Sequence, residues 1–204
     1  MEWKLIKVIQ ETDHPYLNYF TLVYQVKKDD IVKTYEYYMT SRRKKEELIP
    51  VVKKASRPDG VMIPLYYIDR NTGRVSFLLT RQFRPALGLY VTSVPAGLVD
   101  HNDKDIIQTA IREAKEEAGA LIDDIEVIAK IGSTSSGFSD ETNGIVLARI
   151  DHFLTKDLEE FEDIQTRLYD IEEVKKMLSD ENHFFALEVR TLLLYLIQRF
   201  TKKD

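Results

Sequence analysis

The sequence predicts an α/β fold of the α+β kind, in which a mixed β-sheet carries helices on both faces and follows an antiparallel β module. Three observations predict this class. β-Branched and aromatic residues alternate roughly with polar ones over residues 3–40. Apolar residues then recur at spacings of three and four over about 104–118. Strands and helices are interleaved without the regular βαβ repeat of a doubly wound sheet.

The N-terminal part is expected to form a β meander or hairpin. The runs "LNYFTLVYQV" and "IVKTYEYYMT" have strand composition, and "KKDD" at 27–30 supplies a turn between them. The charged stretch "SRRKKEEL" at 41–48 is expected to be a solvated connection, because charge runs usually are. A turn at "RPDG", residues 57–60, marks the boundary. We therefore expect an N-terminal β module at 1–55 and a main domain at 56–204.

The main domain is expected to begin with a hairpin, since "NTG" separates two apolar runs. In the helix that follows, Ile107, Ala110, Ile111, Ala114 and Ala118 define one apolar face, and Gly119 is placed to end it. The expected strands cover 61–69, 75–83, 125–132 and 144–150, and the expected helices cover 104–118, 171–178 and 184–200.

Composition excludes several classes of protein. With 44% hydrophobic and 31% charged residues, the chain can bury a core. A net charge of −5 argues against a protein that wraps nucleic acid, which needs a basic surface. The absence of cysteine excludes disulfides and thiolate metal sites.

No secretory or membrane segment is expected. The N-terminus alternates charged and apolar residues, so it lacks the apolar core of a signal peptide. The most apolar window, "FFALEVRTLLLYLIQRF", contains Glu188 and Arg190 and is too short to span a bilayer. A cytoplasmic location is the expectation.

The stretch "REAKEEAG", residues 112–119, concentrates negative charge on a short helix. Glu113 and Glu117 stand one turn apart and Glu116 lies beside them, an arrangement that costs a few tenths of a kcal/mol per like-charged pair. We expect these acids to lie largely opposite the apolar face. They are then either a solvated flank, with an Arg112–Glu116 pair, or ligands of a divalent cation such as Mg²⁺, which prefers hard oxygen donors.

The residues before the helix favour the metal site. "VPAGLVDHND" places Ala96 and Gly97 at the end of a strand, followed by a polar loop. A glycine there lets the backbone approach a ligand closely, and an exposed carbonyl can serve as an oxygen ligand. Strand, glycine loop and acidic helix together resemble the Nudix hydrolase signature, G-x5-E-x7-R-E-U-x-E-E-x-G-U, where U is a bulky aliphatic residue.

The match to this signature has two departures. The interval from Gly97 to Arg112 is one residue too long, so the isolated first glutamate has no exact counterpart. Counting from Gly97 gives Asp103, which is taken as the stand-in, and counting from Arg112 gives Lys104. Ala114 and Ala120 occupy positions where the signature has bulky aliphatic residues. The positions that match are Gly97, Arg112, Glu113, Glu116, Glu117 and Gly119.

The resemblance implies a fold, a metal site and a reaction. The fold would be a Nudix α/β/α sandwich. Glu113, Glu117 and the Ala96 carbonyl would bind Mg²⁺, or Mn²⁺ in its place, with Glu116 as a further ligand or supporting acid. Arg112 would orient a glutamate. The ions, whose number stays open, would neutralise a diphosphate and activate the attacking water. The implied reaction is the hydrolysis of a nucleoside diphosphate that is linked to another moiety.

Two flanking segments resemble the ADP-ribose pyrophosphatase branch of the family. They are "RQFRPALG…VPAGLVD" and the loop "SSGFSDET" at 135–142, which in that branch lies over the substrate. The implied product pair is AMP and ribose 5-phosphate. The chain has Ser136 where the branch has a marker proline, so GDP-mannose, NADH and oxidised nucleotides stay open as substrates. The residues implied in substrate binding are Arg84, Gly97 and Glu141; none is assigned to the base.

A second acidic run, "DLEEFEDIQ" at 157–165, is either a surface loop or the mobile loop that carries the general base in this branch. The resemblance points to Glu162 first and Glu160 second. The resemblance also implies an intertwined homodimer through the N-terminal module, since short meanders are marginal alone.

The alternative to an enzyme is a Nudix fold that senses ADP-ribose-like ligands without cleaving them. The intact box of glutamates and the absence of a basic recognition helix favour the enzyme.

Overall fold

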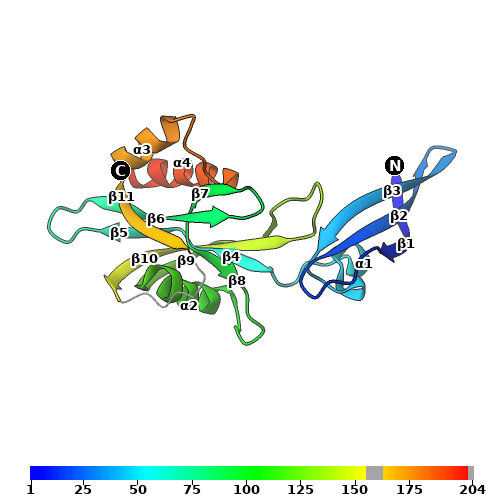
Figure 1. Ribbon diagram of the computed structural model, residues 1–204, viewed down its shortest axis with the longest axis horizontal. Coiled ribbons are helices and arrows are strands. Elements are labelled where there is room, and N and C mark those ends of the chain that lie inside the picture. The colour runs from blue at the N-terminus through cyan, green and yellow to red at the C-terminus, as the bar shows by residue number, and fades with distance from the viewer. Residues whose placement is uncertain (155–162, 202–204) are drawn as a thin grey trace. The chain divides into compact units, whose positions relative to one another are not determined.

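The computed structural model describes residues 1–154 and 163–201, which divide into two compact units (Figure 1). The first unit comprises Met1–Asp59 and Ile131–Asn143, and the second comprises Gly60–Lys130 and Gly144–Asp204. The segment 131–143 thus belongs with the N-terminal strands, although it lies in the middle of the sequence.

The first unit is built on the predicted meander. The strands β1 (Glu2–Gln10), β2 (Asn18–Lys28) and β3 (Ile31–Ser41) form an antiparallel sheet in that order. Asp29 makes the β2–β3 turn in the left-handed region, at φ 54°. A 3₁₀ helix η1 (Lys45–Glu47) and the one-turn helix α1 (Ile49–Val52) follow. The small core contains Val8, Phe20, Leu22, Met39 and Leu48.

The second unit contains an eight-stranded mixed sheet with the strand order β11-β6-β5-β10-β4-β8, in which β7 also pairs with β6 and β9 with β10. The sheet is mixed because β10 runs parallel to β5. The pairs β11–β6, β4–β8, β5–β6 and β6–β7 are antiparallel. Its strands are β4 (Gly60–Met62), β5 (Leu65–Ile68), β6 (Val75–Arg84), β7 (Leu89–Ser93), β8 (Ala96–Leu98), β9 (Ala120–Ser133), β10 (Thr142–Phe153) and β11 (Ile164–Asp170).

Helices cover both faces of this sheet, as the sequence predicts. Helix α2 (Ile106–Ala118) lies on one face, and α3 (Ile171–Ser179) and α4 (Leu187–Thr201) lie on the other (Figure 1). The predicted helices at 104–118, 171–178 and 184–200 are therefore confirmed. None of the helices in the described part of the chain is long and apolar enough to cross a membrane.

Two cores result from the alternation of side chains along the strands. On β6, Phe77 and Leu79 join the core under α3 and α4, while Leu78 joins the core under α2. On β10, Leu147 faces the first of these cores, and its neighbours Val146 and Ala148 face the second. Strands buried on both faces explain the near-continuous apolar runs of the sequence.

One predicted strand is wrong in detail. The run 61–69 forms two strands, β4 and β5, that pair with different partners on either side of Ile63 and Pro64. Proline has no N–H to donate to a ladder, so the pairing changes there. The Pro64 carbonyl still accepts a hydrogen bond from the Ala148 N–H at 3.2 Å. The strand expected to end at Ala96 and Gly97 forms two short strands, β7 and β8, and the strand β11 was not predicted.

Candidate functional site

Helix α2 is fixed at both ends by its own sequence. The Asp105 carboxylate accepts hydrogen bonds from the backbone N–H groups of Ile107 and Gln108, at 2.9 and 3.0 Å, and so caps the N-terminus. Gly119 ends the helix in the left-handed conformation, at φ 59°. Asp105 and Gly119 therefore set the two ends of the helix that carries the acidic residues.

The expected orientation of the acidic residues is wrong for two of the three. Glu113 and Glu117 are buried, each only 9% exposed, whereas Glu116 is partly exposed. Residues three apart are neighbours on a helix, so Glu113 adjoins Ala110 and Glu117 adjoins Ala114 on the buried face. Conversely, Ile111, expected on the apolar face, is 44% exposed. Two carboxylates thus lie between α2 and the sheet.

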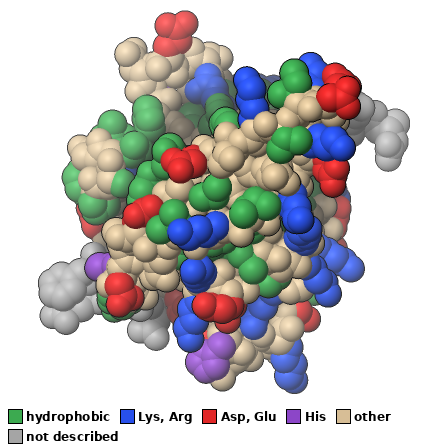
Figure 2. Space-filling view, turned by 90° about the vertical axis from the view of Figure 1, so that its right-hand side faces the viewer, with side chains coloured by type: hydrophobic (Ala, Val, Ile, Leu, Met, Phe, Trp, Pro, Cys, Tyr) green, Lys and Arg blue, Asp and Glu red, His purple; other side chains and the backbone are tan. Residues whose placement is uncertain are grey.

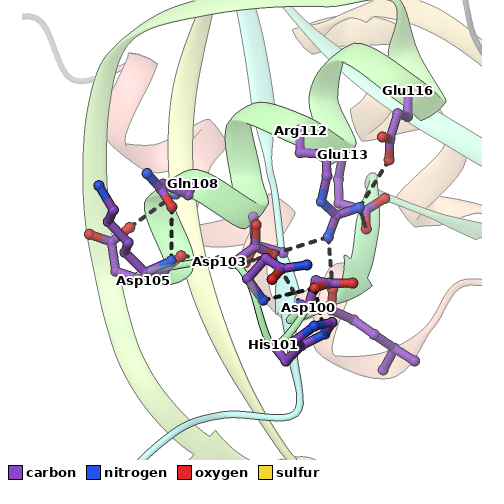
Figure 3. A network of polar contacts seen from close by, with 12 residues as sticks. Asp100, His101, Asp103, Asp105, Gln108, Arg112, Glu113 and Glu116 are labelled. Carbon is purple, nitrogen blue, oxygen red and sulfur yellow. Dashed lines mark hydrogen bonds and ion pairs between the residues drawn. The ribbon is translucent and has the colours of Figure 1, made fainter.

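Arg112 is the centre of the polar network around these acids (Figure 3). Its Nη1 donates to Glu113 Oε1 at 2.6 Å and to Glu116 Oε2 at 2.9 Å. Its Nη2 donates to the Leu98 carbonyl at 3.0 Å and to Asp103 Oδ2 at 3.2 Å. Burial alone would lower the pKa of the guanidinium, but its hydrogen bonds to Glu113 and Asp103 raise that pKa above the ordinary value. The cation is therefore permanent and fixes three acids.

Asp103, taken from the sequence as the stand-in for the isolated first glutamate of the signature, belongs to this network. Its Oδ2 accepts hydrogen bonds from Thr109 Oγ1 at 2.9 Å and from the Asp100 N–H at 3.0 Å, in addition to Arg112. Burial alone would raise the pKa of the Asp103 carboxyl, but hydrogen bonds from Thr109 and Arg112 outweigh it and hold that pKa below its ordinary value. Asp103 therefore joins the loop after β8 to α2.

The backbone of β8 faces the buried glutamates. The Ala96 N–H donates to Glu117 Oε2 at 3.1 Å, whereas the preceding carbonyl, that of Pro95, accepts from Ile63 N–H at 2.8 Å toward β4. Because the N–H and C=O of one strand residue point to the same side, the Ala96 carbonyl is directed to the side of Glu117. The resemblance implies this carbonyl as a metal ligand.

Gly97 is required by the close approach of Glu113. A Cβ built on Gly97 would lie 1.9 Å from both Cδ and Oε1 of Glu113. Any larger residue would therefore displace the Glu113 carboxylate. The glycine was predicted to make room for a ligand, and in the structure it makes room for the Glu113 carboxylate.

The donor types around β8 and α2 fit a divalent cation. Carboxylates of Glu113 and Glu117 and a strand carbonyl are hard oxygen donors of the kind Mg²⁺ prefers. In the described conformation these side chains are held by Arg112 and by the Ala96 N–H. Across residues 1–154 and 163–201, no three or more acids or histidines gather closely enough to hold a metal ion. A bound ion would therefore have to draw the glutamates from their present hydrogen bonds.

The other predicted site residues lie outside this network. Arg84 is exposed at the end of β6, and β5, β10 and β4 separate β6 from β8 in the sheet order. Glu141 belongs to the first unit, where its carboxylate accepts from Thr134 Oγ1 at 3.2 Å and lies 3.5 Å from Arg42 Nε. Glu160 and Glu162 lie outside the described residues.

Two contributions to the site were missed in the sequence. The Leu98 carbonyl binds Arg112, which no side-chain pattern indicates. The cap formed by Asp105 was detectable, because an Asp directly before an apolar helical pattern is a common N-terminal signal.

A NUDIX domain family model matches residues 57–188, more than half of the chain. The chain belongs to the NUDIX domain family. The match includes all of the Arg112 network and extends from the turn before β4 into α4.

Individual relatives agree with the family. A Caenorhabditis elegans protein named "Putative nudix hydrolase 2" is 30% identical over 82 residues, which cover 40% of this chain and 36% of that protein. The chain thus matches about a third of the length of that curated relative. A crystal structure described as an ADP compounds hydrolase superposes with a TM-score of 0.68 at 15% identity, covering 98% of this chain and 94% of the other.

A second solved structure is the NUDIX domain of Shewanella oneidensis NrtR in complex with ADP ribose. It superposes with a TM-score of 0.53 at 17% identity, covering 74% of this chain and 92% of that one. At such identities the likeness shows the fold, which is the predicted Nudix fold.

Replacing Asp103 by Asn should lower the free energy of unfolding at neutral pH, because a charge-assisted hydrogen bond to Arg112 is weakened. Such bonds contribute roughly 1.5–3 kcal/mol, which bounds the loss. The folded-state pKa of Asp103 is depressed, so its contribution is complete above the unfolded pKa near 3.8 and disappears as the pH falls through the folded pKa. Urea unfolding from pH 7 to pH 2 measures this difference.

The matched control is Asp13→Asn, which removes an exposed aspartate of the first unit. It should change stability little at any pH. A difference between Asp103→Asn and the wild type that persists unchanged at pH 2 would contradict the assignment.

Proposed function

We propose that this Nudix protein is a Mg²⁺-dependent hydrolase that cleaves the diphosphate of ADP-ribose, or of a closely related ADP compound, to AMP and a sugar phosphate. One observation carries the proposal. Glu113 and Glu117, each only 9% exposed, bring two carboxylates together with the backbone of the edge strand β8, where Glu113 approaches Gly97 and Glu117 accepts from the Ala96 N–H. Carboxylate and carbonyl oxygens so placed are the donor types that Mg²⁺ prefers.

The chain's own residues would hold and orient the reacting groups. Glu113, Glu117 and the Ala96 carbonyl would bind the metal, and Glu116 would act as a further ligand or supporting acid. Arg112 would keep the Glu113 carboxylate in position through their hydrogen bond of 2.6 Å. The bound metal supplies charge neutralisation for the diphosphate and a more acidic water. Mn²⁺ would serve as a substitute for Mg²⁺.

The choice of an ADP compound is supported by the names of the solved neighbours and by the loop at 135–142. One neighbour is described as an ADP compounds hydrolase, and the other was crystallised with ADP ribose. The loop "SSGFSDET" resembles the substrate loop of the ADP-ribose pyrophosphatase branch. Arg84, Gly97 and Glu141 are proposed to contact the substrate, and Glu162, with Glu160 as second choice, is proposed as the general base.

Hydrolysis should be fastest with ADP-ribose when ADP-ribose, GDP-mannose, NADH and a nucleoside triphosphate are compared in the presence of Mg²⁺. Glu117→Gln should lower kcat at least about 100-fold, since it removes a metal-binding charge, and EDTA should abolish turnover. Glu162→Gln should also lower kcat, by about the 100-fold or more typical of a general base. Product release measured by ion-exchange chromatography gives these rates.

Glu181→Gln, an exposed glutamate outside the box, is the control and should retain wild-type rates. Turnover of another substrate ahead of ADP-ribose would move the assignment to that nucleotide. Absence of turnover with every substrate, together with an ADP-ribose-induced rise in Tm, would replace the hydrolase by a non-catalytic ADP-ribose sensor.

Gly97→Ala should separate catalysis from folding. The new Cβ would meet the flexible end of the Glu113 side chain, so the carboxylate moves while the strand pairing of β8 stays possible. We expect kcat to fall at least about tenfold, as for a displaced catalytic group, with a Tm close to that of the wild type. Gly132→Ala is the control, because its nearest atom to the new Cβ, the Asn143 carbonyl, is 4.0 Å away. A wild-type kcat in Gly97→Ala would show that catalysis does not depend on the position of the Glu113 carboxylate.

We also propose a homodimer formed through the N-terminal sheet. Trp3, 51% exposed, and Tyr35, 47% exposed, pack edge to face at 5.5 Å and present an aromatic surface on β1 and β3. Hydrophobic side chains also reach the surface over the face drawn in Figure 2. Sedimentation velocity should find a dimer for the wild type and a monomer, or a dimer at least about tenfold weaker, for Trp3→Ser. A wild-type monomer at all concentrations would contradict the proposal.

A further inference from the structure

The loop 135–142 is built as a tight turn that contains no proline. The Ser135 carbonyl accepts hydrogen bonds from the N–H groups of Phe138 and Ser139, at 3.1 and 3.0 Å. Ser136 and Gly137 are therefore the central residues of the turn, and neither has a positive φ. Ordering a turn centred on Ser-Gly is costly in entropy, because glycine loses more backbone freedom on ordering than any other residue.

Strand β3 supplies hydrogen bonds that hold this turn. The Thr40 N–H donates to the Phe138 carbonyl at 2.8 Å, and Thr40 pairs with Ser139 in a parallel bridge. The Tyr37 hydroxyl donates to the Gly137 carbonyl at 2.6 Å. The N-terminal sheet therefore holds the turn by hydrogen bonds to the backbone carbonyls of the turn, which do not depend on the side chains that the turn carries.

Arg43 fixes the far end of the loop. Its Nη1 donates to the Asp140 carbonyl at 3.0 Å and lies 3.5 Å from Asp140 Oδ1, while its Nη2 donates to Asp59 Oδ2 at 2.7 Å. The same Asp59 oxygen accepts from the Thr142 N–H at 2.8 Å. Residues 41–48 were predicted to be a solvated connection, but the Arg43 side chain in this segment is only 15% exposed. It is a single cation between two largely buried carboxylates.

An open pocket of the first unit lies beside the loop. Its volume is about 420 Å³. Its walls include Leu22, Tyr24 and Tyr37 on the sheet side and Ser136 and Ser139 on the loop side. On this side of the loop the hydrogen bonds from Tyr37, Thr40 and Arg43 are the contacts that fix its backbone to the sheet and to the segment after it.

We propose that the N-terminal sheet positions the loop 135–142 for substrate binding, with Arg43 and Tyr37 as positioning residues. The inference rests on the proposed function, in which Glu141 of this loop contacts the substrate. Arg43 fixes the residue before Glu141, and Tyr37 holds the turn at Ser136 and Gly137. The N-terminal strands thus have a role within one chain, in addition to any role between two chains.

Tyr37→Phe and Arg43→Gln should raise KM for ADP-ribose at least about tenfold while kcat changes less than about threefold, because binding contacts are lost while the box is intact. Hydrogen exchange of the amides of 135–142 should become at least about tenfold faster in both variants. Lys44→Gln, which neutralises an exposed cation next to Arg43, is the control and should change neither quantity.

A rescue experiment separates positioning from general stability. Ser136 is the second residue of a turn with a negative φ, the position at which proline is favoured. Ser136→Pro in the Tyr37→Phe background should return KM to within about threefold of the wild type, because it restricts the turn without restoring the lost hydrogen bond. A purely structural role of Tyr37 predicts no such recovery.

The two proposals fail in different ways. Wild-type turnover of ADP-ribose with an unchanged KM in Tyr37→Phe and Arg43→Gln would overturn the positioning role and leave the hydrolase standing. Faster exchange of 135–142 without a change in KM would likewise overturn it, because the loop would then not bind substrate. If the wild type neither cleaves ADP-ribose nor binds it in calorimetry, the proposed function fails first and the positioning role falls with it.

Discussion

The guanidinium of Arg112 is the interaction on which the candidate site depends. It neutralises part of the charge of Asp103, Glu113 and Glu116, and it ties α2 to the Leu98 carbonyl at the end of β8. Without this cation, acids one turn apart would repel one another and the burial of Glu113 would be unfavourable. The helix can hold an acidic cluster against the sheet because one permanent positive charge lies inside the cluster.

The edge position of β8 provides the second requirement. In the described part of the sheet β8 pairs only with β4, so alternate backbone groups of β8 are available to α2. Ala96 uses its N–H to bind Glu117, and the lack of a side chain at Gly97 lets Glu113 approach. A central strand would have used these backbone groups in a ladder, and any side chain at position 97 would have filled the space.

The sequence predicted what depends on local spacing and missed what depends on tertiary packing. The helix and its stop at Gly119 follow from spacings along the helix itself, and the structure contains both. Asp103 was singled out by the resemblance to the Nudix signature, and in the structure its carboxylate accepts a hydrogen bond from Arg112. The burial of Glu113 and Glu117 was missed, because charged residues are assigned to the solvated face unless the partner cation is known. Arg43 was missed for the same reason, since its partners Asp59 and Asp140 are remote in sequence.

Both polar clusters use arginine at a position where lysine would not suffice. Arg112 directs Nη1 to residues of its own helix and Nη2 to the end of β8 and the loop after it. Arg43 directs Nη1 to Asp140 and Nη2 to Asp59. A planar fork with two separate donor groups can join two chain segments at fixed geometry, whereas an ammonium is a single point of charge. In a chain with a net charge of −5, a partly buried cation shared by several acids therefore sets the position of backbone segments as well as balancing charge.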